Sequence, residues 1–69
     1  MSVTLKWSKI PGESGFEYAT HKGVRVAHVV KTGDDWTGFV TYPELKWSCV
    51  ERKITDAKRR IRQYITEHN

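Results

Sequence analysis

The stretch that decides the fold is ITDAKRRIRQYITEH, residues 54–68. Its apolar side chains recur at intervals of three and four positions, which is the period of a helix with one buried face. The residues that share this face are Ile54, Ala57, Ile61, Tyr64, Ile65 and His68. Thr55 is a candidate N-cap, and Asp56 in the first turn favours the helix dipole. We therefore predict a helix over about 55–67, whose apolar face needs a partner layer.

The chain before this helix has a period of two. Alternating and β-branched runs, separated by turns that contain glycine, proline and aspartate, predict five strands. These strands cover about 3–10, 16–21, 24–31, 36–42 and 45–52. The short turns favour antiparallel pairing of consecutive strands. We predict one α+β domain over residues 1–69, an antiparallel β-meander of four to five strands with one C-terminal amphipathic helix packed on one face.

Alternation divides the strand residues between two faces of the sheet. We expect the helix to cover the face with the larger apolar side chains, namely Val3, Leu5, Trp7, Phe16, Tyr18, Val24, Val26, Val30, Leu45, Trp47 and Cys49. The open face then carries Lys6, Glu17, His21, Arg25, Ala27, Val29, Lys31, Thr37, Phe39, Thr41, Lys46, Ser48, Val50 and Arg52. The strand over 36–42 has two possible phases. One buries Trp36, Val40 and Tyr42, and the other buries Phe39; the larger side chains favour the first.

The net charge of +4 lies entirely in the last third of the chain. Residues 1–45 hold five basic and five acidic side chains, whereas residues 46–69 hold seven basic and three acidic ones. Such an excess on one strand and one helix indicates a surface that meets an acidic partner. An ordinary solvated face is the alternative, since lysine, arginine and threonine commonly occupy the outer side of a sheet or helix.

The open face combines cations, an aromatic ring and hydroxyl groups, a mixture that sheets use to bind nucleic acid. We predict a non-enzymatic binding module for nucleic acid, with DNA favoured. In this hypothesis Phe39 stacks on bases or wedges between them. The predicted phosphate contacts are Lys6, Arg25, Lys31, Lys46 and Arg52, and the helix residues Lys58, Arg59 and Arg62 add to the positive field.

A second hypothesis is an adaptor or inhibitor that docks on an acidic and apolar patch of a host protein. Phe39 and Val50 then form the apolar anchor, and the basic residues around them form a rim that steers association. Homodimer formation through the same patch is a third alternative, because a short chain gains stability from it.

The sequence shows no motif for catalysis or for binding a metal or cofactor, so we predict none of these functions. Cys49 is the only cysteine, which excludes an internal disulfide and fits a reducing compartment. The three histidines lack the spacing of a metal site. No apolar run approaches the ~20 residues of a membrane-spanning helix, and the first residues lack a signal-peptide pattern. The expectation is a cytoplasmic protein without membrane contact.

Three features carry a resemblance to a known class of proteins. They are the short length, the run Trp36-Thr37-Gly38-Phe39, and the segment Ile54-Thr55-Asp56-Ala57-Lys58 that opens a basic terminal helix. In these features the chain resembles the small accessory proteins of tailed bacteriophages, especially those of actinobacterial hosts. The resemblance implies a non-enzymatic role in host takeover or DNA transactions, in the cytoplasm of the host cell.

A sheet followed by one C-terminal helix is also similar to the arm-type DNA-binding domains of phage integrases and to the plant AP2 domain. Residues 16–65 would cover that unit. This resemblance implies a three-stranded sheet inserted in the major groove of DNA. The reading face would carry Arg25, Lys31, Thr37, Phe39 and Thr41.

Overall fold

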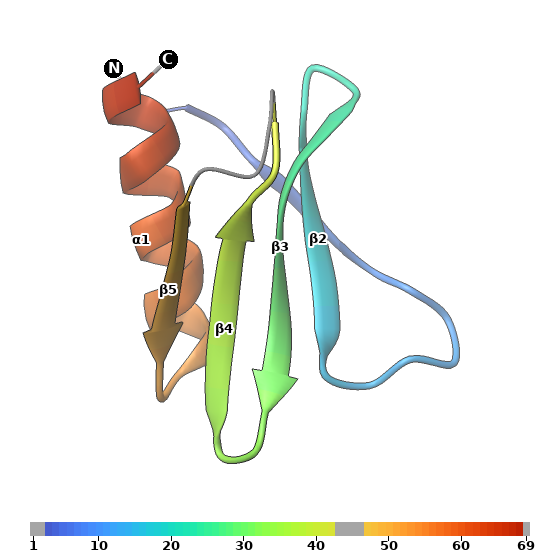
Figure 1. Ribbon diagram of the computed structural model, residues 1–69. Helices are drawn as coiled ribbons and strands as arrows, with labels where there is room; N and C mark the ends of the chain where they lie inside the picture. Colours follow the sequence, from blue (N-terminus) through green and yellow to red (C-terminus); the bar gives the residue numbers. More distant parts are fainter. Residues whose placement is uncertain (1–2, 43–46, 69) are drawn as a thin grey trace.

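The computed structural model describes residues 3–42 and 47–68, which form a five-stranded sheet and one helix (Figure 1). The elements are β1 (Lys6–Lys9), β2 (Phe16–His21), β3 (Val24–Thr32), β4 (Asp35–Val40), β5 (Trp47–Glu51) and α1 (Ile54–His68). The strands pair antiparallel in the order β1-β2-β3-β4-β5. The predicted α+β meander with a C-terminal helix is therefore confirmed. Two predicted strand residues, Leu45 and Lys46, lie outside the described part of the chain.

The turn between β2 and β3 shows how the sequence sets a tight reversal. Lys22 and Gly23 are its two central residues, and both have positive φ angles, 54° and 79°. A two-residue loop with two positive φ angles matches the right-handed twist of the strands on either side. Glycine adopts such an angle at little steric cost, which favours the hairpin at this position.

A β-bulge in the β2–β3 hairpin changes the phase of the sheet. The register reads Ala19 opposite Ala27, then Thr20 opposite Arg25. Val26 is consequently an extra residue on β3, and both Val26 and Ala27 are buried, at 6% and 0% exposure. The alternation that begins at Val24 therefore does not continue through β3. Val29 belongs to the buried core, whereas Val30 lies on the other face.

Helix α1 begins one residue before its predicted start. The carbonyl oxygen of Lys53 accepts hydrogen bonds from the N–H groups of Asp56 and Ala57, at 3.2 and 3.1 Å. Thr55 therefore lies inside the first turn, not at the N-cap position that the sequence indicated. Asp56 is still in the first turn, where its carboxylate favours the helix dipole.

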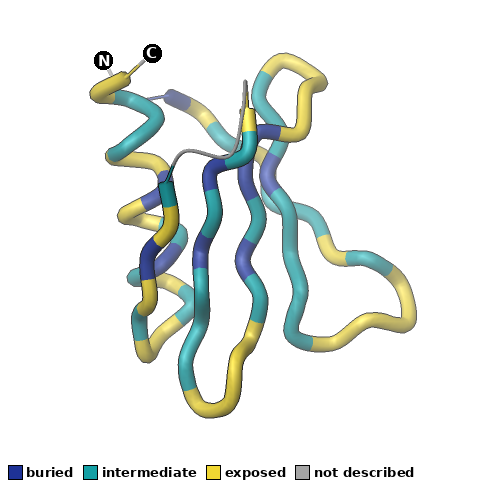
Figure 2. The backbone as a smooth tube through the Cα atoms, viewed as in Figure 1, coloured by how far each residue is buried: buried dark blue, intermediate teal, exposed yellow. Residues whose placement is uncertain are grey.

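Small side chains form the floor on which α1 packs. Ala27, Val29 and Val40 form one buried cluster with Ala57 and Ile61 of the helix. Figure 2 shows these buried stretches along the middle of the strands and on α1, with exposed residues at the turns. The margins of the cluster are sealed by Leu5, Trp7, Trp36, Trp47, Ile54, Tyr64 and Ile65. The aromatic residues on the helix side thus lie around the contact and not at its centre.

Helix and sheet lie close together at Gly38 on β4. A Cβ atom at this position would lie 2.8 Å from Cδ1 of Ile61 and 3.2 Å from Sγ of Cys49. Both distances are tighter than ordinary van der Waals contact. The layers meet this closely because residue 38 has no side chain.

The helix contacts β3, β4 and β5, and the N-terminal segment reaches it from the other side. The N–H of Val3 donates a hydrogen bond to Oγ1 of Thr66, at 3.1 Å. In Figure 1 the segment before β1 passes behind the sheet toward the C-terminal end of α1. Val3 is buried and Leu5 packs on the core, so both lie on the helix side as predicted.

The predicted division of faces is right for β1, for β5 and for Trp36 and Val40 of β4, but wrong for most of β2 and β3. Glu17, Ala19, Ala27, Val29 and Lys31 occupy the helix side, and Phe16, Tyr18, His28 and Val30 occupy the open face. Two further residues expected under the helix, Val24 and Tyr42, are 40% and 56% exposed. The bulge accounts for the change of phase on β3. On β2, Ala19 belongs to the buried cluster, and Glu17 reaches α1 through its side chain, which contacts Lys58.

Candidate functional site

An aromatic row crosses the face of the sheet that α1 leaves open. The ring centroids of Phe16 and His28 are 5.5 Å apart, and those of His28 and Phe39 are 4.9 Å apart. The planes are inclined by 22° and 34°. The rings come from β2, β3 and β4, and the register places Tyr18, His28 and Phe39 opposite one another. The antiparallel pairing thus assembles one row of rings from three strands.

The imidazole of His28 lies in the middle of this row. Burial lowers the pKa of His28 below its ordinary value of 6.5, and the charge of Arg25 lowers that pKa further. His28 is therefore neutral near pH 7. It contributes a flat polar ring to the row and not a positive charge.

Two cations lie at one end of the aromatic row. The guanidinium carbon of Arg25 is 4.0 Å from the centroid of the Tyr18 ring, a cation–π contact. Thr20 of β2 pairs with Arg25 on one side and with Lys6 of β1 on the other. Both basic side chains are exposed, so both are accessible to an anionic group at this margin.

A second row on the open face carries methyl and hydroxyl groups. Val30, Thr37 and Val50 follow Phe16 across the sheet. The hydroxyls of Thr32 and Thr37 lie 2.9 Å apart. Val50 is 59% exposed, which leaves an apolar side chain available to a partner.

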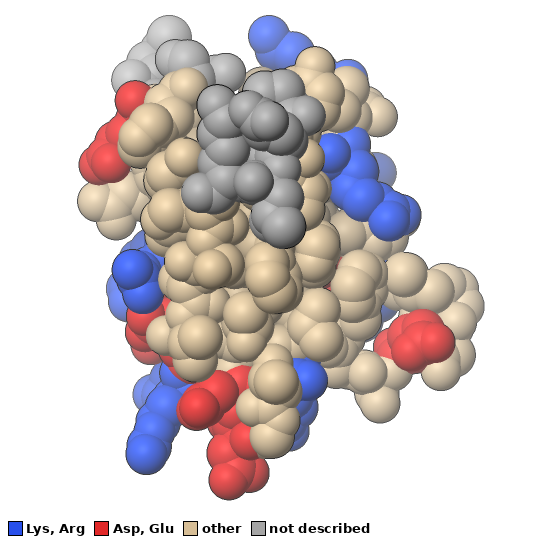
Figure 3. All heavy atoms as spheres, viewed as in Figure 1, with Lys and Arg blue, Asp and Glu red and all other residues tan. Residues whose placement is uncertain are grey.

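The middle of the open face is uncharged. In Figure 1, β5 passes in front of α1, so this view looks onto the face away from the helix. Figure 3 has the same view, and outside the grey atoms its Lys, Arg, Asp and Glu side chains lie around the rim. A partner on this surface makes its central contacts with rings, methyl groups and hydroxyls, and meets charge at the margin.

The predicted site residues divide between different parts of the molecule. Lys6, Arg25 and Phe39 come together on the open face. The predicted position of Lys31 on the open face was wrong. Lys31 has the same phase as Val29, so it lies on the helix side, exposed near the end of β3. Arg52 is exposed directly after β5. Lys46 lies outside the described residues.

The basic residues of α1 are on another surface, and most of them contact carboxylates. Nζ of Lys58 donates to Oε1 of Glu17 at 2.8 Å and lies 4.9 Å from the centroid of the Trp7 ring. The other two pairs are Arg59 Nη2 with Asp56 Oδ1 and Arg60 Nη1 with Glu51 Oε2, each at 2.6 Å. Within residues 3–42 and 47–68, Arg62 forms no ion pair.

Sequence reasoning missed Phe16, Tyr18 and His28 as open-face residues. It assigned the two bulky ones to the core on the general rule that large apolar side chains are buried. The signal that could have found them is the set of small residues in their neighbourhood. Ala19 and Ala27 are paired across β2 and β3 and are fully buried in the cluster that Ala57 and Ile61 of the helix join, so the face that carries these alanines is the covered one.

Chemistry of other kinds finds little support in the described residues. No group of three or more His, Cys, Asp or Glu side chains in 3–42 and 47–68 is placed to hold a metal ion. Cys49 is buried, and that burial raises the pKa of its thiol, which disfavours the reactive thiolate. Among the described residues, the helix is too short and too polar to cross a membrane.

No family model, curated protein or solved structure matches this chain. The candidate site is therefore defined by geometry alone. Its elements are the row Phe16–His28–Phe39, the Tyr18–Arg25 contact, Lys6 at the same margin, and the neighbouring methyl and hydroxyl groups.

Proposed function

We propose that this protein is a non-enzymatic binding module that takes single-stranded nucleic acid on the open face of its sheet. The observation that carries the proposal is the row Phe16–His28–Phe39, whose rings lie across three adjacent strands. Unpaired bases stack on such platforms, and each stacked base contributes about 1–3 kcal/mol. The hydroxyls of Thr32 and Thr37 add polar contacts for base edges or sugars.

The charges favour a single strand over a duplex as the ligand. Sheet insertion in the major groove depends on many phosphate contacts along both strands. Among the described residues, the predicted phosphate contacts that the strand pairing places on the open face are Lys6 and Arg25; Lys31 lies on the other side, and Arg52 follows the end of β5. Stacking therefore contributes most of the affinity in this proposal, and the two cations position one backbone.

Fluorescence anisotropy of labelled single-stranded and duplex DNA tests the proposal. We expect micromolar binding of the single strand, weakened about sevenfold between ~50 and ~200 mM salt, as two phosphate contacts predict. Replacing Phe39 with leucine keeps an apolar side chain but removes the ring, so it should weaken binding about tenfold or more. Tyr64→Leu is the matched control, because Tyr64 is a half-buried ring that stacks on Trp47 outside this face.

Two results would overturn the nucleic-acid proposal. One is the absence of single-strand binding at the lower salt concentration. The other is equal weakening by Phe39→Leu and Tyr64→Leu, which would show that the open face is not the binding surface. RNA of the same sequence should be compared in the same assay, because a stacking platform accepts both sugars unless a protein group reads the 2′-hydroxyl.

One observation favours the second candidate function, an adaptor or inhibitor that docks on a host protein. The described residues leave the centre of the open face uncharged, and Val50 is 59% exposed beside it. Protein interfaces have such an apolar centre with charges at the rim. If the protein binds no DNA, sedimentation of the protein alone and with host lysate would distinguish a homodimer from a complex with a partner. Either role would place the protein in the cytoplasm of a phage-infected host, consistent with its resemblance to phage accessory proteins.

A further inference from the structure

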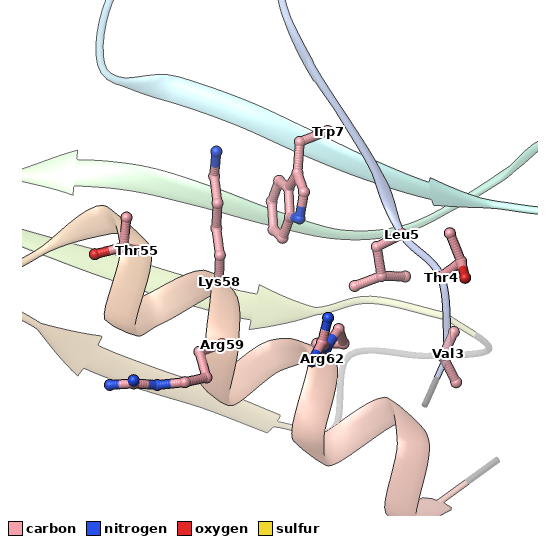
Figure 4. A pocket seen from close by; sticks show the side chains of 8 residues that line it. All are labelled: Val3, Thr4, Leu5, Trp7, Thr55, Lys58, Arg59 and Arg62. Carbon is pink, nitrogen blue, oxygen red and sulfur yellow. The ribbon is translucent and has the colours of Figure 1, made fainter. Parts of the chain in front are cut away.

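A groove of about 460 Å³ lies on the helix side of the sheet, between the N-terminal strand and α1 (Figure 4). In Figure 4, Leu5 and Trp7 project from the strand toward the helix, and Lys58 extends from α1 beside the Trp7 ring. The described residues that line it are Val3, Thr4, Leu5, Trp7, Thr55, Lys58, Arg59 and Arg62. The groove thus has apolar side chains from the strand on one wall and cations from the helix on the other.

The strand wall of the groove is the edge of the sheet. β1 pairs with β2 alone among the described strands, so its other edge has no strand beside it. The N–H of Val3 points to Thr66 on the helix, and the carbonyl oxygen of Thr4 accepts from Nδ1 of His21 in β2. Because backbone groups of an extended chain alternate between its two edges, those of Leu5 and Trp7 face the free edge. An edge of this kind is a template for another strand.

The helix wall of the groove is positively charged. Lys58, Arg59 and Arg62 line it, and the lining includes no acidic residue from 3–42 or 47–68. Lys58 is held by Glu17, but the side chain of Arg59 is 73% exposed, and exposed ion pairs such as Arg59–Asp56 exchange partners at little cost. The two guanidinium groups can therefore turn to a carboxylate of a ligand in the groove.

We propose that this groove binds an extended acidic peptide segment of a partner protein, which adds to the free edge of β1 as a sixth strand. Its backbone pairs with the N–H and C=O groups of Leu5 and Trp7. Side chains on one face of the added strand then reach the helix, where carboxylates meet Arg59 and Arg62. This site is separate from the open face, so it does not depend on the proposed nucleic-acid binding. Strand addition supplies affinity through main-chain hydrogen bonds, and the cations select an acidic sequence.

An NMR titration of the isotope-labelled protein tests this site. The probe is a blocked eight-residue peptide that alternates glutamate and valine, and the control peptide has lysine in place of glutamate. We expect saturable binding of the acidic peptide only, with shifts at the groove and slower hydrogen exchange of the Leu5 and Trp7 amides. An acidic peptide methylated on alternate backbone nitrogens should fail to bind, because it lacks the donors for a strand.

A charge reversal in the groove provides the matched variant. Arg62→Glu should weaken the acidic peptide about tenfold, a loss of one favourable charge contact and gain of a repulsive one. Lys31→Glu makes the same change in net charge at an exposed residue that does not line the groove, and it should change affinity by less than about twofold. Arg62→Gln removes the positive charge without reversing it, so the loss of affinity for the acidic peptide should be intermediate.

Several outcomes would overturn the proposal. Equal weakening of peptide binding by Arg62→Glu and Lys31→Glu would show a general effect of net charge and no specific binding in the groove. Chemical-shift changes confined to His28 and Phe39 would show that the peptide binds to the open face. Binding of the methylated peptide with full affinity would rule out strand addition to β1. Displacement of the acidic peptide by single-stranded DNA from the Arg62-dependent site would make the groove a nucleic-acid site instead.

Discussion

The two faces of the sheet use side-chain size in opposite ways. The face under α1 has small residues at its centre, with Ala19 and Ala27 fully buried and Gly38 close to Ile61 of the helix. The open face has rings, with Phe16 and Phe39 on either side of His28. Globular proteins usually bury their largest apolar side chains. Here the layer contact depends on close approach, and much of the aromatic surface is left to the face without a covering element.

This difference separates stability from binding. Substitutions under the helix should reduce the free energy of unfolding, because a tightly packed interface tolerates neither cavities nor added atoms. Substitutions on the open face should mainly change what the protein binds. A chain of 69 residues has little stability to lose, so the contrast should be large enough to measure.

The largest effect is expected at Ile61, the fully buried side chain at the centre of the helix contact. Ile61→Ala removes three carbons and leaves a cavity, which should cost about 2–5 kcal/mol of unfolding free energy. Val50→Ala on the open face is the control and should cost less than about 0.5 kcal/mol, because Val50 is 59% exposed. Urea denaturation followed by circular dichroism measures both. Similar losses for the two variants would contradict the division between the faces.

The next effect is expected where helix and sheet lie close together. Gly38→Ala adds a Cβ that would sit 2.8 Å from Cδ1 of Ile61, and the resulting strain should cost about 1–3 kcal/mol. Ile61→Val removes that same Cδ1 atom and alone should cost about 1 kcal/mol. The double variant should therefore be more stable than the sum of the two losses predicts. Strict additivity in urea denaturation would show that Cδ1 is not the atom that limits the approach.

The sequence predicted the architecture because the signals for it are local. The period of residues 54–68 marks the helix, and the turn at Lys22-Gly23 marks a hairpin with positive φ angles. Short turns leave consecutive strands little choice except antiparallel pairing. The antiparallel meander and the C-terminal helix follow from these local features, and both are confirmed.

The faces of β2 and β3 were not predictable in the same way. Nothing in the residues around Val26 announces a bulge, because it arises from pairing with β2 and not from the β3 sequence alone. Size was also misleading, since it placed Phe16 and Tyr18 in the core. The distance between the layers is a tertiary property, and the small residues Ala19, Ala27 and Gly38 are the features of the sequence that hint at it. Phe39 was placed correctly on the open face. The phase that buries Trp36 and Val40 was favoured because it buries the larger side chains, and it leaves Phe39 on the other face of β4.

A smaller effect should come from the one ion pair that bridges helix and β2. Lys58 Nζ and Glu17 Oε1 are 2.8 Å apart, with side chains 26% and 13% exposed. Glu17→Gln keeps the shape but removes the charge, and should cost about 1 kcal/mol. Glu51→Gln, whose partner Arg60 is more exposed, is the control and should cost less. Equal losses would mean that partial burial adds nothing to the Lys58–Glu17 pair.

The smallest effect is expected from His28, because it depends on one proton on the open face. Burial and the charge of Arg25 lower the pKa of His28 in the folded protein, whereas the unfolded chain has the ordinary value of 6.5. The unfolded state therefore takes up a proton at higher pH than the folded state does. The contribution of His28 to stability is complete above pH 6.5 and is lost as the pH falls through the lower folded value.

Thermal denaturation across this pH range measures the effect of His28. His28→Gln leaves a polar side chain that does not titrate, so its stability should fall less steeply than that of the wild type between neutral pH and the folded pKa of His28. Parallel curves for the two proteins would mean that the imidazole is solvated like a free histidine and that Phe16 and Phe39 do not enclose it. A steeper fall for the wild type would show that burial in the aromatic row, together with the charge of Arg25, keeps the imidazole neutral even without a ligand.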